Sequence, residues 1–114
     1  IAASAAAQCG RGCIPQVTAL SSYREALQRA ASAELRLLPY ENEHSLSLRA
    51  ALGGCEFHTA AILTGPEGGF EPEEVTLAQE YGFQSCTLGP RILRCETAPL
   101  CALTAILFAC GDLD

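Results

Sequence analysis

The sequence contains no methionine, tryptophan or lysine, and only 6% of its residues are aromatic. A complete translation product begins with methionine, which is not trimmed before a residue as large as Ile1, so we expect an internal piece of a longer protein. All seven basic residues are arginines, against 13 acidic residues, and the formal net charge is −6. A domain this acidic is a poor general binder of nucleic acid, because phosphate contacts dominate such binding. Any action on RNA would depend on a few well-placed arginines and on another domain or subunit.

Metal-site spacing is also missing. The seven cysteines include no C-x-x-C pair, and His44 and His58 lie far from any pair of cysteines, so we expect no metal and assign neither histidine a role. Several cysteines lie inside apolar runs, which favours buried free thiols in a reducing, cytoplasmic compartment over disulfides. The longest uncharged apolar stretch, 97–111, is too short to span a bilayer, so no membrane partner is expected.

The 114 residues, 49% of them hydrophobic, predict one small folded domain. Helical and strand-like patterns alternate along the chain. We predict helices at 1–9, 22–31, 45–52 and 72–81 and after 96, and strands at 14–17, 35–38, 58–64 and 84–88. Ser22 and Ser45 are the predicted N-caps of two of these helices. This order predicts an α/β fold, a parallel sheet with helices packed on both faces.

Two unusual loops, 65–70 and 89–96, follow predicted strands. Ligands of parallel sheets bind beyond the carboxyl ends of the strands, so these loops predict a site. The first reads GPEGGF, and Gly68 and Gly69 permit positive φ and close approach of a ligand to the backbone. It is neither a P-loop nor a G-x-G-x-x-G turn. A tight connection without a ligand explains it equally well on sequence alone.

The second loop reads GPRILRCE and places the apolar pair Ile92 and Leu93 among charged residues. Exposed loops are normally polar, so this pair indicates a loop that is buried or covers a ligand. Arg94 and Glu96 could alternatively form a local ion pair that only holds the loop.

The predicted C-terminal helix is apolar nearly all round. Leu100, Leu103 and Leu107 share one face, while Ala102 and Ile106 lie on others. Such a helix is buried on more than one side, and in a domain this small we expect the second side to contact another subunit. A central core helix within one chain is the alternative.

Four segments together resemble a known family: AAAQCGR at 5–11, GPEGGF at 65–70, LGPRILR-x-ET at 88–97 and GDL at 111–113. They resemble the ribosomal RNA small-subunit methyltransferase E family, SPOUT-class enzymes that methylate N3 of a uridine in 16S ribosomal RNA. The resemblance covers essentially the whole chain. The alternatives are a SPOUT relative that methylates another RNA, at a ribose 2′-hydroxyl or a tRNA base, and a non-catalytic α/β nucleotide-binding or dimerisation module.

The resemblance implies a trefoil knot at the C-terminal end, with loop 89–96 threaded under loop 65–70 and S-adenosylmethionine between them. It implies an active site at a homodimer interface and the small ribosomal subunit as partner. Residues 1–114 would be a partial SPOUT domain, without the family's N-terminal PUA-like domain and the first strand and helix of its catalytic domain.

The resemblance and the chemistry of the transfer also assign residues. A methyl on a sulfonium is already electrophilic, so no metal is needed, and Arg94 is the candidate to stabilise the charge left when uridine N3 loses its proton. Glu96 is a candidate base or an orienter of Arg94, and Arg11 and Arg91 are candidates for RNA phosphate contacts. The expected cofactor-binding residues are Leu38, Pro39, Thr64, Gly65, Pro66, Glu67, Gly68, Gly69, Leu88, Gly89, Pro90, Ile92, Leu93 and Thr97.

Overall fold

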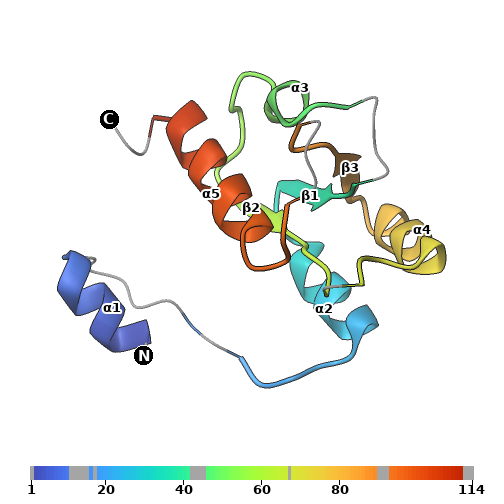
Figure 1. Cartoon of the computed structure of the whole chain (residues 1–114), viewed down its shortest axis with the longest axis horizontal. Coiled ribbons are helices and arrows are strands. Elements are labelled where there is room, and N and C mark those ends of the chain that lie inside the picture. The colour runs from blue at the N-terminus through green and yellow to red at the C-terminus, as the bar shows by residue number, and fades with distance from the viewer. Residues whose placement is uncertain are drawn as a thin grey trace.

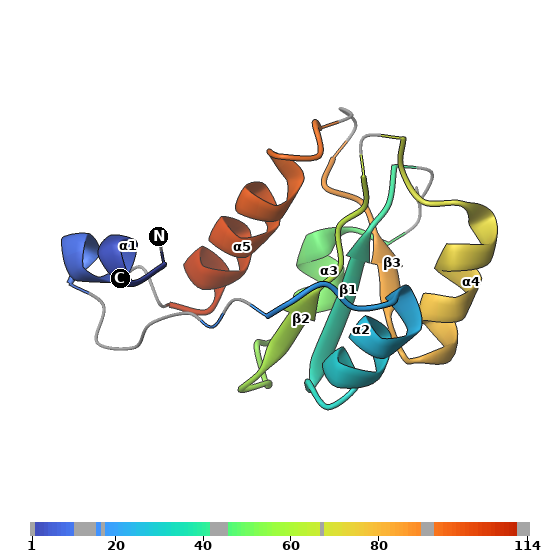
Figure 2. The same ribbon diagram turned by 90° about the horizontal axis from the view of Figure 1, so that it is seen from below.

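The computed structural model describes residues 2–10, 16, 18–41, 46–66, 68–89 and 93–111. In order, its elements are α1 (Ala2–Cys9), α2 (Tyr23–Ala30), β1 (Leu35–Pro39), α3 (Leu48–Leu52), β2 (Ala60–Ile62), α4 (Pro72–Glu80), β3 (Gln84–Cys86) and α5 (Ala98–Ala109) (Figure 1). The helix α1 stands apart from the sheet in both ribbon views (Figures 1 and 2).

The three strands form one parallel sheet in the order β2-β1-β3. Leu35 to Leu37 of the central strand pair with Ala60 to Ile62, and Leu37 to Pro39 pair with Gln84 to Cys86. Each outer strand therefore pairs with only part of β1, which explains why β2 and β3 are shorter than the predicted 58–64 and 84–88. Because all strands run the same way, the loops that follow them gather at one end of the sheet, the upper end in Figure 2. The parallel α/β fold is confirmed.

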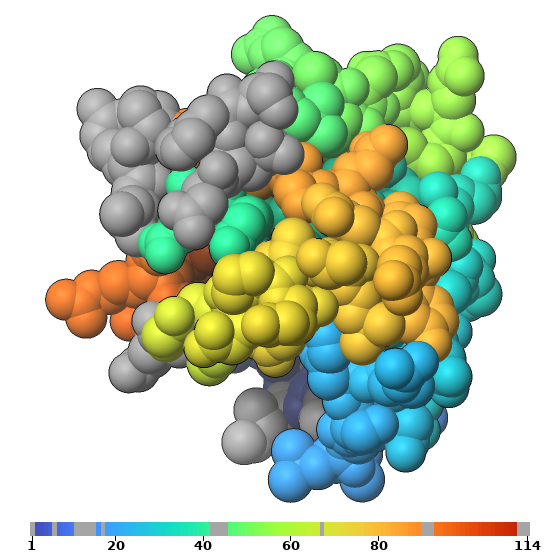
Figure 3. Space-filling view, turned by 90° about the vertical axis from the view of Figure 1, so that its right-hand side faces the viewer, coloured from blue at the N-terminus to red at the C-terminus, as the bar shows by residue number. Residues whose placement is uncertain are grey.

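Helices cover both faces of the sheet because successive residues of β1 point to opposite sides. Leu38 packs in a core cluster with Leu27 of α2 and Val75 of α4. Its neighbour Leu37 packs in the other cluster, which includes Leu52 of α3 and Ile106 of α5. Both leucines are fully buried, and each such burial stabilises the fold by roughly 1.5–3 kcal/mol. Figure 3 shows α2 and α4 side by side on the surface that covers the first cluster.

Local capping explains where three helices begin. Ser22 caps α2 as predicted, and its Oγ accepts a hydrogen bond from the Glu25 N–H at 3.2 Å. The helix α3 starts later than predicted, because Ser47 provides the N-cap with its Oγ 3.1 Å from the Ala50 nitrogen. Ser45, the predicted cap, lies outside the described residues, as does most of the predicted strand 14–17. At α4, where Glu71 is the N-cap, the Glu74 carboxylate accepts the Glu71 N–H at 2.8 Å.

The helix α5 is buried on one side only within this chain. Ala102 and Ile106 face the sheet and are buried, whereas Leu100, Leu103 and Phe108 are exposed. The alternative of a central core helix covered within one chain is therefore wrong for the described residues. In the described part, no helix is both long and apolar enough to cross a membrane.

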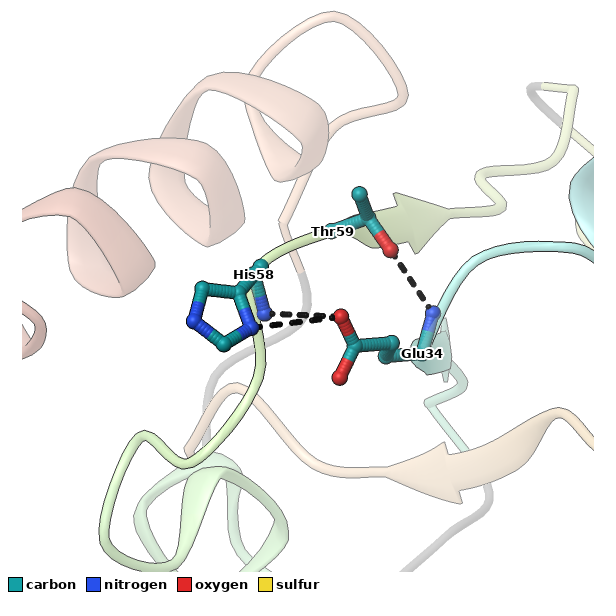
Figure 4. Close-up of polar contacts among 3 residues, drawn as sticks. All are labelled: Glu34, His58 and Thr59. Carbon is teal, nitrogen blue, oxygen red and sulfur yellow. Dashed lines mark hydrogen bonds and ion pairs between the residues drawn. The ribbon is translucent and has the colours of Figure 1, made fainter.

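His58 lies at the amino end of the sheet, opposite the loops that follow the strands (Figure 4). Its backbone N–H donates to Glu34 Oε1 at 3.2 Å, and its Nδ1 lies 3.5 Å from the same oxygen. The Glu34 N–H in turn donates to Thr59 Oγ1 at 2.9 Å. These contacts join the starts of β1 and β2, and a contact between side chains this exposed contributes little to stability. His58 thus lies at the surface and helps to hold the starts of two neighbouring strands together.

Gly82, in the turn between α4 and β3, occupies a position that should require glycine. Its φ is +87°, and a Cβ there would lie 2.7 Å from an Arg36 guanidinium nitrogen. Arg36 donates a hydrogen bond to the Ala31 carbonyl, which restricts its freedom to move aside. We expect Gly82→Ala to destabilise the protein by about 1–3 kcal/mol in thermal denaturation.

Gly54→Ala is the matched control, because Gly54 is not at positive φ and its Cβ would meet only ordinary contacts at 3.9 Å. An equal loss of stability in both variants would contradict this account of Gly82.

Candidate functional site

A cavity of about 490 Å³ lies at the carboxyl end of the sheet. The described residues that line it are Pro39, Tyr40, Glu41, Thr64, Gly65, Pro66, Gly69, Phe70, Thr87, Leu88, Gly89, Leu93, Arg94, Cys95, Glu96 and Ala98. They come from the segments that follow β1, β2 and β3 and from the start of α5. The described residues of loops 65–70 and 89–96 therefore border one cavity at this end, as the sequence predicted.

Backbone conformation shapes the first loop. The Gly69 N–H donates to the Pro66 carbonyl at 2.9 Å, and Gly69 adopts a φ of +78° that disfavours other residues. The Phe70 ring folds back over Gly65, so that a Cβ at Gly65 would lie only 3.0 Å from the ring. Gly69 is thus needed for the turn, and Gly65 for the close approach of Phe70.

Tyr23 fixes Phe70 to the body of the domain. The centroids of the two rings lie 6.4 Å apart, and the planes are tilted by 45°. The Tyr23 hydroxyl donates to the Glu74 carbonyl at 2.7 Å. Burial, and to a lesser extent the charge of Glu74, raises the pKa of the Tyr23 phenol above its usual range, so the donor keeps its proton at neutral pH. The wall formed by loop 65–70 is therefore held by α2 and α4.

The second loop begins with a short hydrogen-bonded turn. Thr87 Oγ1 accepts from the Gly89 N–H at 3.1 Å and donates to the Gly89 carbonyl at 3.0 Å. Gly89 has a φ of +116°, and no atom would come within 4 Å of a Cβ there. Farther along, the Arg94 carbonyl accepts from the N–H groups of Thr97 at 3.0 Å and Ala98 at 2.9 Å, which sets the start of α5.

Three ionisable side chains line the cavity: the acidic Glu41 and Glu96 and the basic Arg94. All three are exposed. Among the described residues no ion pair joins Arg94 to Glu96; instead Glu96 Oε2 lies 3.4 Å from Cys95 Sγ. The alternative of a loop held by an Arg94–Glu96 ion pair is therefore not what this structure contains. The two carboxylates favour a ligand with a positive centre, and the guanidinium favours a partly negative one.

The predicted catalytic, cofactor-binding and RNA-binding residues divide into three groups according to where the structure places them. The cavity brings together Pro39, Thr64, Gly65, Pro66, Gly69, Leu88, Gly89 and Leu93, with the catalytic candidates Arg94 and Glu96 beside them. Arg11, Glu67, Pro90, Arg91 and Ile92 lie outside the described residues.

Leu38, Gly68 and Thr97 are not part of the cavity wall. Leu38 points into the core between β1, α2 and α4, because strand alternation places it on the face of the sheet that these helices cover. Gly68 is exposed, with nothing within 4 Å of a Cβ built on it. Thr97 lies on the outer side of α5.

Sequence reasoning did not include Tyr40, Glu41, Phe70, Thr87, Cys95 and Ala98 among the residues of the site. Tyr40 and Glu41 directly follow β1, so the rule that ligands bind beyond strand ends would have found them. Phe70 and Cys95 belong to the two loops already singled out. No sequence motif marked Thr87. Its hydroxyl closes the turn at Gly89, and a threonine shortly before a glycine has no distinctive pattern.

A second feature, the outer groove of α5, borders the cavity. The groove is lined by Thr97, Leu100, Cys101, Thr104, Ala105 and Phe108. Leu100 is 67% exposed and Phe108 is 72% exposed. Large apolar side chains gathered on a surface mark an interaction site. Because Thr97 lines the groove and Ala98 the cavity, a partner on α5 would lie next to the cavity.

Comparison with known proteins gives a consistent result. The model of the RNA methyltransferase domain family matches residues 1–107. The chain is 36% identical over 113 residues to the ribosomal RNA small subunit methyltransferase E of Bacillus subtilis, covering 95% of the chain and 44% of that protein. It is 39% identical over 108 residues to the protein of the same name from Synechocystis, covering 93% and 36%. The chain thus spans less than half the length of these relatives.

Solved structures agree with the sequence relatives. A methyltransferase from Legionella pneumophila, in complex with the bound cofactor S-adenosylmethionine, superposes with a TM-score of 0.84 at 33% identity, covering 95% of this chain and 43% of that one. Ribosomal RNA small subunit methyltransferase E from Neisseria gonorrhoeae, bound to S-adenosylmethionine, gives a TM-score of 0.82 at 37% identity, covering 94% and 44%.

Proposed function

The chain belongs to the RNA methyltransferase domain family, and from this membership we propose that it supplies the S-adenosylmethionine-binding, catalytic part of an enzyme that methylates N3 of a uridine in 16S ribosomal RNA. The observation that carries the proposal is the single cavity shared by loops 65–70 and 89–96. The same loops carry the GPEGGF and LGPRILR segments on which the resemblance of the sequence rests. The reaction would take place in the cytoplasm, on the small ribosomal subunit.

The cavity suits the cofactor in size and chemistry. Its volume of about 490 Å³ lies within the usual range for a small-molecule site. Gly65, Gly69 and Gly89 place backbone at the cavity wall, where the adenosine can lie close to it, and Leu88 and Leu93 offer apolar walls. When bound, S-adenosylmethionine supplies an electrophilic methyl group on its sulfonium.

Arg94 and Glu96 have distinct roles in this proposal. Glu96 accepts the proton of uridine N3, and the negative charge then spreads onto the ring oxygens. The Arg94 guanidinium, whose backbone is held by the turn at the start of α5, stabilises that charge. The nitrogen lone pair then takes the methyl, and the electrons of the broken carbon–sulfur bond stay on sulfur.

The proposal includes a homodimer formed through the outer groove of α5. Exposed apolar residues that lie next to a cavity are expected where a second subunit completes a site. It also includes the trefoil knot of the SPOUT class, with the loop after β3 threaded under the loop after β2. Arg11 and Arg91 are proposed to contact RNA phosphates, and a preceding PUA-like domain is proposed to supply most of the affinity for RNA, because this segment is acidic.

Cofactor binding by two glycine variants tests the site. Valine at Gly89 would be strained by the φ of +116° and would place its side chain at the cavity wall. We therefore expect Gly89→Val to weaken S-adenosylmethionine binding at least about tenfold in titration calorimetry, equivalent to about 1.4 kcal/mol. Gly68→Val is the control, since Gly68 does not line the cavity, and it should bind like wild type. Equal binding by the wild type and both variants would remove this cavity from the cofactor site.

The methylated position separates the proposed reaction from that of other RNA methyltransferases. Small subunits treated with the enzyme and the cofactor are digested to nucleosides and analysed by mass spectrometry. We expect a methyl group on a uracil base, and a methyl on a ribose would contradict the N3 assignment.

A further inference from the structure

Glu41 is a carboxylate in the cavity wall that the reaction described above does not use. It follows Tyr40 just after the end of β1, the central strand, so it stands between the loops that follow β2 and β3. Its Oε1 would lie 3.7 Å from a Cβ at Gly69, which places the carboxylate against the backbone of loop 65–70. Within the described part of the chain it makes no hydrogen bond or ion pair. The carboxylate is therefore available to a ligand.

The charge of the methyl donor changes during the reaction. A carboxylate in the cavity can therefore bind the donor before the reaction more strongly than after it. S-adenosylmethionine carries a sulfonium cation, whereas its product, S-adenosylhomocysteine, has a neutral thioether at the same position. A carboxylate beside this position attracts the substrate and not the product. Discrimination of this kind favours exchange of spent cofactor for fresh cofactor.

We propose that Glu41 positions the cofactor by facing its sulfonium, so that the site binds S-adenosylmethionine in preference to S-adenosylhomocysteine; this rests on the function proposed above. Glu96 is a weaker candidate for this role, because its Oε2 already lies 3.4 Å from Cys95 Sγ and it stands beside Arg94. Glu41, by contrast, forms no ion pair with a described residue. The two carboxylates thus have separate roles: Glu41 faces the sulfonium of the methyl donor, and Glu96 accepts the proton of uridine N3.

The test compares ligands that differ in charge at one atom. Titration calorimetry is carried out on wild type and Glu41→Gln with three ligands. These are S-adenosylmethionine, S-adenosylhomocysteine and sinefungin, an amine analogue with an ammonium group at that position. We expect Glu41→Gln to weaken the two cationic ligands about five- to tenfold and leave the neutral one unchanged. The difference should shrink at about 1 M salt, where the Debye length is about 3 Å.

Glu56→Gln controls for the loss of one negative charge, because Glu56 is exposed and does not line the cavity. It should leave all three affinities unchanged. An equal loss for all three ligands in Glu41→Gln, or no loss for any, would overturn the assignment while leaving the cofactor site in place. Failure of wild type to bind any of the three ligands would instead overturn the proposed function itself.

Discussion

Replacing Arg94 with alanine is expected to lower methyl transfer to the small ribosomal subunit by about 10²–10³-fold, the usual cost of removing one preorganised group that stabilises developing charge. Arg94 lies at the cavity wall on the turn that starts α5, and no described ion pair occupies its guanidinium. Affinity for S-adenosylmethionine should stay within about twofold of wild type, since the charge that Arg94 stabilises is on the uridine ring. Single-turnover transfer of a labelled methyl group and calorimetry measure the two quantities.

Arg49→Ala is the matched control for the loss of an arginine. Arg49 is exposed on α3 and does not line the cavity. It should retain normal transfer. If Arg94→Ala also keeps normal transfer, or loses cofactor affinity to the same extent, the catalytic assignment is wrong.

A dimer formed through α5 should dissociate when charge is introduced into its groove. In the double variant Leu100→Glu and Phe108→Glu, two exposed apolar side chains become carboxylates that would have to be buried at the interface. Burial of unpaired charge costs several kcal/mol, so we expect dimer affinity to fall at least about 100-fold. Sedimentation velocity over a range of concentrations measures this shift, and methyl transfer should fall with it.

Leu20→Glu provides the control for this experiment. Leu20 is as exposed as a side chain can be, but it lies in the extended segment before α2 and not on α5. It should leave the association state unchanged. A groove variant that sediments like wild type would show that α5 is not the dimer interface.

Much of the fold follows from local pattern. The predicted helices at 1–9, 22–31 and 72–81 and the strand at 35–38 are present within one or two residues, because apolar spacing and caps such as Ser22 act over a few neighbours. The second serine cap was placed differently: Ser47 caps α3, and two nearby serines give the same local signal. Strand lengths also differed, since they depend on how far each outer strand pairs with β1.

In the site too, local motifs predicted some residues, whereas the position of others depends on the tertiary fold. Gly65, Gly69 and Gly89 were predicted from motif alone, and they line the cavity. Leu38 was expected beside them, but the pleat of β1 turns it into the core. Glu41 was not expected, although its position just after β1 agrees with the rule that ligands bind beyond the ends of parallel strands.

Sequence alone determined the kind of elements, their order and the two motif-bearing loops, because helix and strand periodicity and glycine-rich turns are properties of neighbouring residues. The tertiary structure decided which face each side chain takes, how the three strand ends converge on one cavity, and which apolar side of α5 remains uncovered. These outcomes depend on contacts between residues far apart in the chain, such as Leu37 with Ile106, whose pairing no local pattern encodes.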